Sequence, residues 1–367
     1  MIKYLIWGTG KRSQNLFGRM KLYPYAKQQF EIVAFISNDT NNGETLDSIP
    51  IISPLKIAEY EYDYICIWST YEKEIREEIS DLGISPDKVK DIYEDLYNGL
   101  KQQYEASDDP EINEIMKEID KTRKPAWIYY YNADKEWPLM EAFFDESKDM
   151  FFVMFEEKRM YLSCDYKEDD FIVKDGKKYI GNVWAEQDKN SPHRYEEGDV
   201  CVKEGDVIVD CGACEGNFTL HNIDKVSKAY IIECDPGWQE ALRYTFEPYR
   251  DKVVFCNKFV SDKDTDKDIT IDSLVKDRVN YIKMDIEGEE IAALRGAKKT
   301  LDDNQDICCS ICAYHRHGDA EKITKELEEH GFECSPSNGY MLFLADNDVW
   351  EHPELRRGVI RAHKARR

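Results

Sequence analysis

Short apolar runs separated by longer polar, helix-like stretches recur through the second half of the chain. Five of them have the length and the apolar content of strands that are buried on both faces. They lie at residues 207–209, 229–232, 253–256, 281–284 and 307–313. The stretches between them leave room for crossover helices, and a helical pattern over 320–330 follows the last run. This alternation predicts a doubly wound parallel sheet of the α/β class, closed by an antiparallel hairpin over 333–345 around Asn338-Gly339.

The first hundred residues show the same α/β pattern on a smaller scale, which predicts a Rossmann-like domain. The predicted strands and the one helix that follows them lie at residues 4–7, 32–36, 50–52, 64–68 and 72–82. Gly8-Thr9-Gly10 follows the first run, and Ser13 stands where a dinucleotide fingerprint has its third glycine. Two interpretations stay open, a pocket for a nucleotide or nucleotide sugar, and an old nucleotide-binding fold kept for docking or dimerisation.

The region from 99 to 199 has a mixed pattern. Asp108-Asp109-Pro110 predicts a linker that ends at a helix over 111–121, and Asp175-Gly176 predicts a hairpin between two strand-like runs. Aromatic residues are dense between 127 and 152, and we expect core packing there, although such a cluster can also line a sugar-binding face. Ser191-Pro-His-Arg-Tyr195 precedes the main sheet, where we expect a connecting loop, with a reach over the pocket as the alternative.

These changes of pattern divide the chain into four regions. We predict a Rossmann-like N-terminal domain at 1–98, a mixed helical and strand connecting and cap region at 99–199, the main α/β domain at 200–348 and a basic tail at 349–367. From Leu355 onward the tail is rich in arginine. We expect a solvated terminal helix there, with contact to an anionic surface as the alternative.

Composition and charge argue against several partners. The 367 residues are 42% hydrophobic and 34% charged, and their formal net charge is −24. So acidic a chain is not expected to bind nucleic acid, because phosphate binding needs a basic surface. No apolar run approaches the roughly 18 residues that span a bilayer, and the N-terminus opens on a strand-like run rather than a signal peptide. We therefore expect a cytoplasmic protein with no membrane span, and homo-oligomers are possible.

Eleven cysteines include two C-x-x-C spacings, Cys211/Cys214 and Cys309/Cys312. We do not expect zinc at either pair. Cys309 and Cys312 stand three residues apart on a predicted strand and therefore face opposite sides. Cys211 and Cys214 flank a glycine turn, where a metal would compete with a bound cofactor. We expect reduced, mostly buried thiols.

The candidate cofactor site begins where the strand at 207–209 runs into Asp210-x-Gly212-x-x-x-Gly216. A dinucleotide fold would use G-x-G-x-x-G, so that helix amides hold a pyrophosphate. A carboxylate ahead of the first glycine would repel phosphate, but it suits a cofactor with an ammonium and a sulfonium group, such as S-adenosylmethionine. Glu233 ends the next predicted strand, 23 residues after Asp210, where an acidic side chain can accept both hydroxyls of a ribose.

The candidate reaction site consists of charged residues at the ends of the fourth and fifth predicted strands. Strand alternation places Lys283, Asp285 and Glu287 on a common side if the extension continues that far. Asp285 would then face the cofactor, and His315 follows the fifth strand at the same edge. A structural salt-bridge cluster is the alternative interpretation. Asp285, Glu287 and His315 could also ligate a divalent metal ion, which we do not favour because nothing fixes the geometry.

Taken together, these motifs resemble the FkbM-type methyltransferase family over roughly residues 200–332. The matching segments are Val-Ile-Val-Asp210-Cys-Gly-Ala, Ile-Glu233-Cys-Asp-Pro, Val260-Ser261-Asp262, Ile271-Asp272-Ser-Leu, Tyr-Ile-Lys283-Met-Asp285-Ile-Glu287-Gly-Glu-Glu and Leu-Arg-Gly296-Ala. One departure is Ala313-Tyr314-His315, where an acidic residue before the histidine is commoner. Residues 1–98 resemble, more loosely, the nucleotide-sugar-binding domain ahead of bacterial sugar acyltransferases.

The resemblance implies an S-adenosylmethionine-dependent O-methyltransferase acting on a hydroxyl of a sugar, a nucleotide-linked sugar or a related small metabolite. Asp285 or His315 would take the hydroxyl proton, Glu287 would hold a neighbouring hydroxyl, and Lys283 would keep Asp285 charged. Val260 and Ser261 would lie along the adenine. The full set of implied cofactor-binding residues is Asp210, Gly212, Ala213, Gly216, Asn217, Glu233, Asp235, Val260 and Ser261.

Three other functions remain open at this stage. The chain could be a non-catalytic nucleotide-binding scaffold, or an oxidoreductase or epimerase that binds an NAD-type cofactor at Gly8-Thr9-Gly10. It could also be a methyltransferase whose acceptor is a lipid or a peptide amine.

Overall fold

A computed structural model describes residues 1–10, 30–40, 43–69, 71–92, 94–122, 139–167, 170–181, 186–343 and 348–364. By contacts the chain forms two compact units, which are described separately below. The N-terminal unit comprises Met1–Trp127 and Phe343–Glu354, and the large unit comprises Ile128–Leu342 and Leu355–Arg367. The domain boundaries expected from the sequence stay predictions. Within the described ranges, no helix combines the length and the apolar character that a membrane crossing requires.

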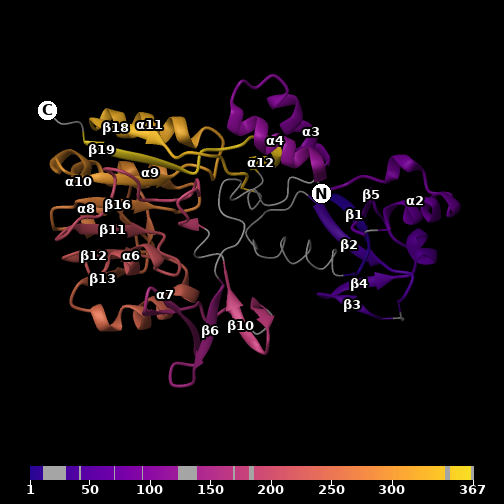
Figure 1. Ribbon diagram of the computed structural model, residues 1–367, viewed down its shortest axis with the longest axis horizontal. Coiled ribbons are helices and arrows are strands. Elements are labelled where there is room, and N and C mark those ends of the chain that lie inside the picture. The colour runs from indigo at the N-terminus through magenta and orange to yellow at the C-terminus, as the bar shows by residue number, and fades with distance from the viewer. Residues whose placement is uncertain are drawn as a thin grey trace. The chain divides into compact units, whose positions relative to one another are not determined.

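The N-terminal unit contains a five-stranded sheet in the order β3-β4-β2-β1-β5 (Figure 1). Its strands are β1 (Ile2–Trp7), β2 (Phe30–Ile36), β3 (Thr45–Leu46), β4 (Ile49–Ile52) and β5 (Tyr64–Ile67). Only β3 runs antiparallel to its neighbour among these pairings. Alternate residues such as Leu5 and Trp7 point into one hydrophobic core. The α/β pattern predicted from the sequence is therefore confirmed for this unit.

Helices complete the unit. They are η1 (Pro54–Glu59), α2 (Glu72–Asp81), η2 (Pro86–Lys88), α3 (Glu94–Tyr104), α4 (Pro110–Thr122) and α12 (Asp348–Glu351). Helix α4 begins at Pro110, as its linker pattern predicted. At Gly8, φ is +136°, and a Cβ atom there would lie 2.7 Å from the carbonyl oxygen of Trp68. The close approach of the backbone thus explains this glycine, whereas Ser13 of the same motif lies outside the described residues.

The large unit is organised around a seven-stranded sheet in the order β13-β12-β11-β16-β17-β19-β18 (Figure 1). Its strands are β11 (Val207–Cys211), β12 (Lys228–Ile232), β13 (Val253–Cys256), β16 (Tyr281–Met284), β17 (Cys308–Cys312), β18 (Phe332–Pro336) and β19 (Val359–Lys364). Strands β11, β12, β13, β16 and β17 run parallel. This confirms the five predicted strands and the α/β fold class.

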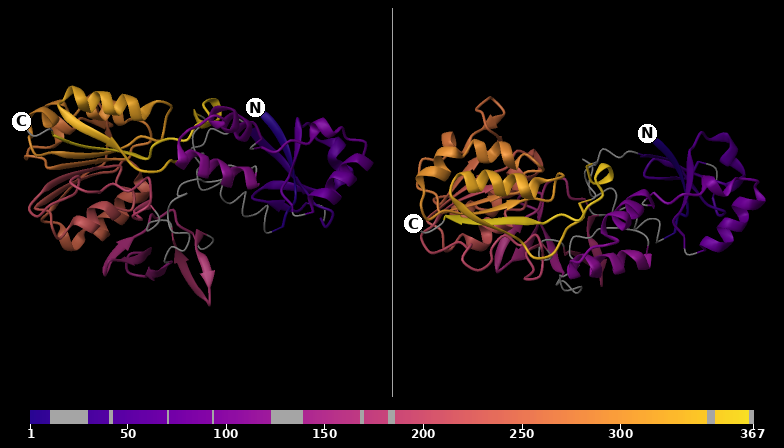
Figure 2. Two further views of the ribbon diagram at one scale, coloured as in Figure 1. Left: turned by 45° about the horizontal axis from the view of Figure 1, so that its top comes forward. Right: turned by 90° about the horizontal axis from the view of Figure 1, so that it is seen from above.

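The two faces of this sheet are covered differently. Val209, Ile282 and Ile311 point into a hydrophobic core that helices close on one side. The helices of that side are α8 (Ile271–Leu274), α9 (Glu290–Arg295), α10 (Lys298–Asp303) and α11 (Asp319–Glu329). Helix α11 packs along β18 and β19 (Figures 1 and 2). Asp210 and Lys283 point to the opposite face, so the polar side chains of the strands gather there.

The opposite face of this sheet is covered by a helix and by the segment that precedes β11. Phe218 of α6 (Asn217–Asn222) packs on Tyr281 with a centroid distance of 5.4 Å. The carbonyl oxygen of Tyr195 accepts a hydrogen bond from Ser310 at 2.8 Å. The remaining elements of the unit are α7 (Pro236–Thr245), η4 (Glu247–Tyr249), β14 (Phe259–Val260) and β15 (Asp268–Ile269). A buried polar layer therefore lies directly against the carboxyl half of the strands.

The C-terminal part of the sheet differs from the prediction. Strand β18 pairs antiparallel with β19, which inserts between β17 and β18. The prediction that an antiparallel pair closes the sheet is confirmed, but the second strand of the pair is β19 and does not follow the turn at Asn338-Gly339 directly. The solvated terminal helix expected from Leu355 is wrong. Val359, Ile360 and Ala362 are buried in the sheet, so the apolar residues between the arginines decide the conformation of the tail.

A second, antiparallel sheet in the order β8-β7-β6-β10-β9 forms what we call the cap sheet. Its strands are β6 (Met140–Asp145), β7 (Met150–Phe155), β8 (Lys158–Tyr161), β9 (Ile172–Lys174) and β10 (Lys177–Ile180). Asp175 and Gly176 both have positive φ, at 52° and 73°, as a type I′ hairpin turn requires, which confirms the predicted hairpin. Met150 and Tyr161 pack against Ala241 of α7. Trp127–Tyr131 and Trp137 of the aromatic-rich segment lie outside the described residues.

Candidate active site

The candidate site lies at the carboxyl ends of β11 and β16, where the strand order of the seven-stranded sheet reverses. After β11 the chain enters a turn in which Gly212 and Gly216 have φ of +71° and +78°. A Cβ atom at Gly212 would lie 1.8 Å from the carbonyl oxygen of Asp285, so only glycine fits. The amide of Asp285 donates to the carbonyl of Cys211 at 3.0 Å. The glycine turn and Asp285 are thus held side by side.

Asp210 and Lys283 form a buried ion pair beneath this turn. The Lys283 Nζ atom lies 3.1 Å from Asp210 Oδ1, and the side chains are 4% and 0% exposed. Thr219 donates its hydroxyl to Asp210 Oδ2 at 2.7 Å, and Lys283 also donates to the carbonyl oxygen of Gly212. The side chain of Asp210 has no exposed surface. It therefore supports the glycine turn through its buried contacts and does not itself line an open site. The expectation that Lys283 pairs with Asp285 needs correction, because its ion-pair partner is Asp210.

Glu233 connects the end of β12 to the glycine turn. Its Oε2 accepts a hydrogen bond from the amide of Cys214 at 2.9 Å, and its Oε1 accepts one from the amide of Asp235 at 2.8 Å. Burial raises the pKa of Glu233, although these two amides oppose the rise. Each carboxylate oxygen has two lone pairs, so both can accept a further hydrogen bond. The position at a strand end therefore suits a diol ligand.

The other predicted cofactor residues have mainly structural contacts in the described part of the chain. Asp235 caps α7 by accepting a hydrogen bond from the amide of Gly237 at 2.8 Å. Asn217 is buried at the start of α6, and Ala213 is buried within the turn. Val260 belongs to the hydrophobic core, and Ser261 follows it at the half-exposed end of β14. A Cβ atom at Gly296 would lie 2.0 Å from the carbonyl of Ser261, which explains that glycine.

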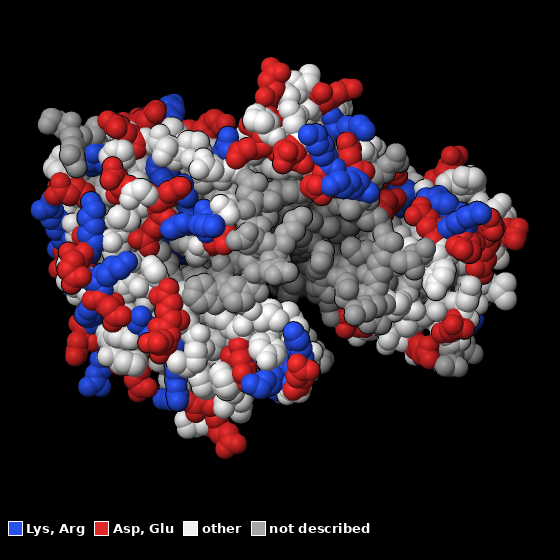
Figure 3. Space-filling view, in the orientation of Figure 1, with Lys and Arg blue, Asp and Glu red and all other residues white. Residues whose placement is uncertain are grey.

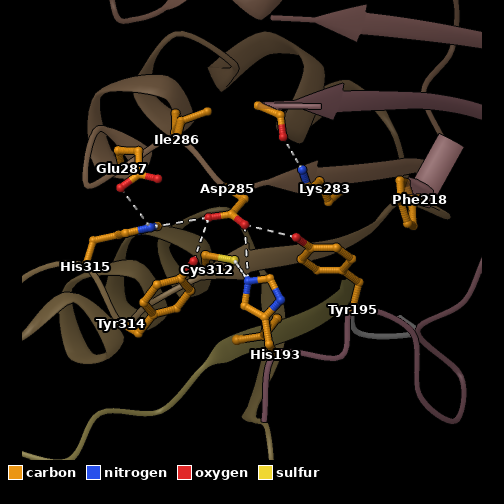
Figure 4. Close-up of polar contacts among 12 residues, drawn as sticks. His193, Tyr195, Phe218, Lys283, Asp285, Ile286, Glu287, Cys312, Tyr314 and His315 are labelled. Carbon is orange, nitrogen blue, oxygen red and sulfur yellow. Dashed lines mark hydrogen bonds and ion pairs between the residues drawn. The ribbon is translucent and has the colours of Figure 1, made fainter. Parts of the chain in front are cut away.

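Asp285 is held by four side chains (Figure 4). On Oδ2, His193 Nε2 lies at 3.1 Å and the Tyr195 hydroxyl at 3.0 Å. On Oδ1, the Tyr314 hydroxyl lies at 3.2 Å and His315 Nε2 at 3.3 Å. Burial would raise the pKa of Asp285, but the contacts with the two histidines hold it well below its usual range. Asp285 is therefore an ionised and immobilised carboxylate.

His315 lies between carboxylates on both sides of its ring. Its Nδ1 is 3.2 Å from Glu290 Oε1, and its Nε2 faces Asp285 and, at 3.7 Å, Glu287 Oε2. Burial alone would lower the pKa of His315, but the charges of Glu290, Asp285 and Glu287 raise it well above its usual value. A protonated imidazole cannot accept a proton, so His315 does not suit the proton-accepting role expected from the sequence.

Glu287 also departs from its expected position. Strand β16 ends at Met284, and Glu287 has a φ of +56°, so the strand alternation does not continue to it. Its side chain is 77% exposed. Lys283 and Asp285 still share a face, because the alternation holds through the end of the strand.

His193 and Tyr195 are the site residues that the sequence interpretation missed. They belong to the segment that was expected to be a plain connecting loop, and both side chains are buried against Asp285. The carbonyl oxygens of Arg194 and Tyr195 accept hydrogen bonds from Arg361 of β19, at 2.6 and 3.1 Å. The only signal in the sequence was the position of this segment just before the main sheet. The predicted alternative, a reach over the pocket, is closer to the structure.

Among the residues that the structure describes, two groups of donor atoms lie close enough to hold a metal ion. In each, the donor atoms are within 4.8 Å of one another, and the groups are His193, Asp285 and Cys312, and Asp285, Glu290 and His315. In the second group, the carboxylates of Asp285 and Glu290 face different nitrogens of the His315 ring. Direct charge-assisted contacts between the carboxylates and the ring explain this arrangement. All eleven cysteines are free in the structure, and Cys309 and Cys312 face opposite sides of β17.

We expect Asp319, which lies beside this site, to make the free energy of unfolding depend on pH. Burial raises its pKa to about 6, against about 3.9 in an unfolded chain. Because the folded state prefers the neutral acid, the free energy of unfolding of the wild type should fall as the pH rises from about 4 to 6. We expect Asp319→Asn to remove this loss, so that the variant gains stability over the wild type across that window and keeps the gain above pH 7. Urea denaturation at several pH values measures the difference.

Asp302→Asn provides the control for this prediction. Hydrogen bonds from His330 and Lys298 lower the pKa of Asp302. Its charged form is therefore preferred in the folded state, so the substitution should reduce stability at pH values above about 4, and the reduction should shrink as the pH falls below about 4. Equal pH profiles for Asp319→Asn and the wild type would contradict the prediction.

Comparisons with known proteins agree with this arrangement at the level of domains. Residues 257–334 match the family model of the Methyltransferase FkbM domain, and residues 1–90 match that of the C2185-like N-terminal domain. The FkbM resemblance is confirmed, whereas the resemblance of the N-terminal region to sugar acyltransferases is not. No match was found among the curated proteins.

Several solved structures are similar over part or most of the chain. The Methyltransferase FkbM of Methylobacillus flagellatus KT is 15% identical, with 98% of this chain and 90% of that one covered and a TM-score of 0.46. Magnesium protoporphyrin IX methyltransferase of Synechocystis PCC 6803, with bound SAM, is 13% identical, with 44% and 71% covered and a TM-score of 0.30. A putative RNA methyltransferase of Pyrococcus horikoshii is 15% identical, with 44% and 73% covered and a TM-score of 0.30. Likeness of this degree says nothing about substrate.

Proposed function

We propose that this chain, which carries an FkbM methyltransferase domain at residues 257–334, is a methyltransferase that uses S-adenosylmethionine and acts on a hydroxyl of a small molecule such as a sugar. The observation that carries the proposal is the juxtaposition at the sheet edge. The glycine turn after β11, Glu233 after β12 and Asp285 after β16 stand at the position where doubly wound sheets bind their ligands.

The chemistry of this edge fits the cofactor. Glu233 is anchored by two amides and keeps lone pairs for the two ribose hydroxyls. The surroundings are acidic, since Glu186, Glu215 and Asp285 lie near one another, and burial together with the other two carboxylates raises the pKa of Glu186 to about 7. Lys283, the buried cation of the layer, is tied to Asp210 below the turn. Such surroundings favour a cationic ligand over a pyrophosphate.

When bound, S-adenosylmethionine supplies an electrophilic methyl group on sulfur. The residues of the chain must then hold the acceptor oxygen in line with that methyl group and withdraw the hydroxyl proton. Asp285 lies at the carboxyl edge of the sheet next to the glycine turn, where both of these functions are needed. Its four partners fix its position, so that any group it orients is fixed as well.

An uncharged, hydroxylated acceptor is more consistent with this site than a nucleic acid. The formal net charge of the chain is −24, and the acidic groups Glu186, Glu215 and Asp285 lie together at the site. On the face shown in Figure 3, lysine and arginine side chains are interspersed with acidic ones and form no continuous basic surface. A polyanion would meet repulsion here, because its binding depends on basic residues.

Calorimetry with S-adenosylhomocysteine tests the cofactor site. We expect the wild type to bind it and Glu233→Gln to bind it about 10- to 100-fold more weakly, because a hydrogen bond to a charged group contributes about 1.5–3 kcal/mol. The matched control is Glu240→Gln on the exposed side of α7, which should leave the affinity unchanged. Transfer of tritium from labelled S-adenosylmethionine to a panel of hexoses and methyl glycosides then tests the acceptor. Absence of both binding and transfer in the wild type would refute the proposed function.

A further inference from the structure

We infer that His193 is the general base of this site and that Asp285 is the residue that positions it. The inference rests on the proposed function and assigns its proton-accepting group. Neither residue role follows from strand order alone, because His193 comes from the segment ahead of the sheet and Asp285 from the end of β16.

The two nitrogens of His193 have different surroundings. Its Nε2 lies 3.1 Å from Asp285 Oδ2 and 3.6 Å from the sulfur of Cys312. Its Nδ1 is buried and has no hydrogen-bond partner among the residues that the structure describes. The side chain as a whole is 4% exposed. A buried polar atom without a partner is unfavourable, so Nδ1 is the atom for which a hydroxyl group of a ligand would supply the missing partner.

Asp285 determines which nitrogen carries the proton. An ionised carboxylate only accepts hydrogen bonds, so His193 Nε2 must be the donor of the pair. In neutral imidazole the other nitrogen, Nδ1, then has the free lone pair. Tyr195, Tyr314 and His315 occupy the remaining directions around the carboxylate and keep it from turning (Figure 4). The carboxylate therefore fixes both the tautomer and the orientation of His193.

The proposed step balances in atoms and electrons. The acceptor oxygen forms a bond to the methyl carbon while the carbon–sulfur bond breaks, and the electron pair of that bond stays on sulfur, which becomes a neutral thioether. The hydroxyl proton passes to Nδ1 of His193. The resulting imidazolium is stabilised by the charge of Asp285 at 3.1 Å and returns its proton to solvent after the product has left.

His315, Cys312 and Tyr195 do not offer an equivalent base. Both nitrogens of His315 already face carboxylates. The groups that face His193 are Asp285 after β16, Cys312 and Tyr314 from β17 and its end, Tyr195 from its own segment, and Glu186. Burial raises the pKa of both Cys312 and Tyr195 well above their usual values, so these two groups stay neutral.

Nitrogen-15 NMR of the whole chain with labelled histidine tests the assignment without an acceptor. The His193 signals are identified by their loss in His193→Gln. In the neutral ring of the wild type we expect the proton on Nε2 and an unprotonated Nδ1. In Asp285→Asn the amide can donate to Nε2, so we expect the tautomer to shift toward a protonated Nδ1. A protonated Nδ1 in the neutral wild-type ring would overturn the inference, whatever the enzyme methylates.

Kinetics provide the second measurement. For a hydroxyl acceptor from the panel, His193→Gln should lower kcat about 100-fold or more, with the dissociation constant for S-adenosylhomocysteine changed less than about two-fold. The control His363→Gln removes a half-exposed histidine from β19 and should leave both values unchanged. If the wild type transfers methyl groups and His193→Gln keeps more than a third of kcat with the same pH profile, the inference is wrong while the proposed function stands. If the wild type neither binds the cofactor product nor transfers, the proposed function has failed.

Discussion

Lys283→Met is expected to lower the free energy of unfolding by about 3–5 kcal/mol. The substitution removes the ammonium group 3.1 Å from Asp210 and leaves that carboxylate, which has no exposed surface, without its counter-ion. Attraction from Asp210 outweighs burial and raises the pKa of Lys283, so the ammonium group is charged throughout the physiological range. Urea denaturation of the whole chain, followed by circular dichroism, measures the loss.

Two variants control this prediction. In Lys283→Met combined with Asp210→Asn neither charge of this pair remains, so we expect the double variant to recover part of the lost stability. Lys298→Met removes a lysine that is 69% exposed and should change stability by no more than about 0.5 kcal/mol. A loss below about 1 kcal/mol for Lys283→Met alone would show that the ion pair does not support the turn.

Arg361→Met is expected to reduce methyl transfer by about 10- to 100-fold with little change in the affinity for S-adenosylhomocysteine. Arg361 is 6% exposed, and its guanidinium donates to the carbonyl oxygens of Arg194 and Tyr195 and pairs with Glu197 at 2.6 Å. These contacts hold the segment that carries His193. A displacement of about 1 Å at a reacting group can reduce the rate about 100-fold.

Arg278→Met is the matched control for Arg361→Met. It removes an arginine that is 62% exposed and paired only at the surface with Asp306. Activity and cofactor affinity should both stay unchanged in this variant. Equal activity of Arg361→Met and the wild type, with the fold retained, would show that β19 does not position the segment that carries His193.

The pattern of the sequence predicted the five parallel strands of the main sheet because each is a short apolar run, and four of them, β11, β12, β16 and β17, are buried on both faces. Residues at the ends of these strands, such as Glu233 and Asp285, could be placed at one edge, since parallel strands end together. The glycine turn was also recognisable, because Gly212 has no substitute where backbone approaches backbone so closely.

The tail was misinterpreted because its charges suggested an exposed helix. Strand β19 has the apolar residues Val359, Ile360 and Ala362, but Arg361 stands among them. Its guanidinium is satisfied by main-chain carbonyls more than 160 residues away in the sequence, and no local pattern reveals such partners. Hydrophobic periodicity predicts on which face of a helix or strand a residue lies, but not which residues it contacts there.

The five parallel strands, the position of the turn and the presence of charged residues at the sheet edge follow from the sequence by itself, since they depend on local periodicity and on the geometry of single residues. The pairing of those charged residues was decided only by the tertiary structure. Lys283 faces Asp210 and not Asp285, His315 is enclosed by carboxylates, and His193 reaches Asp285 across 92 residues of chain. The physical reason is that ionisable side chains acquire their charge state and role from neighbours in space, and those neighbours come from distant segments.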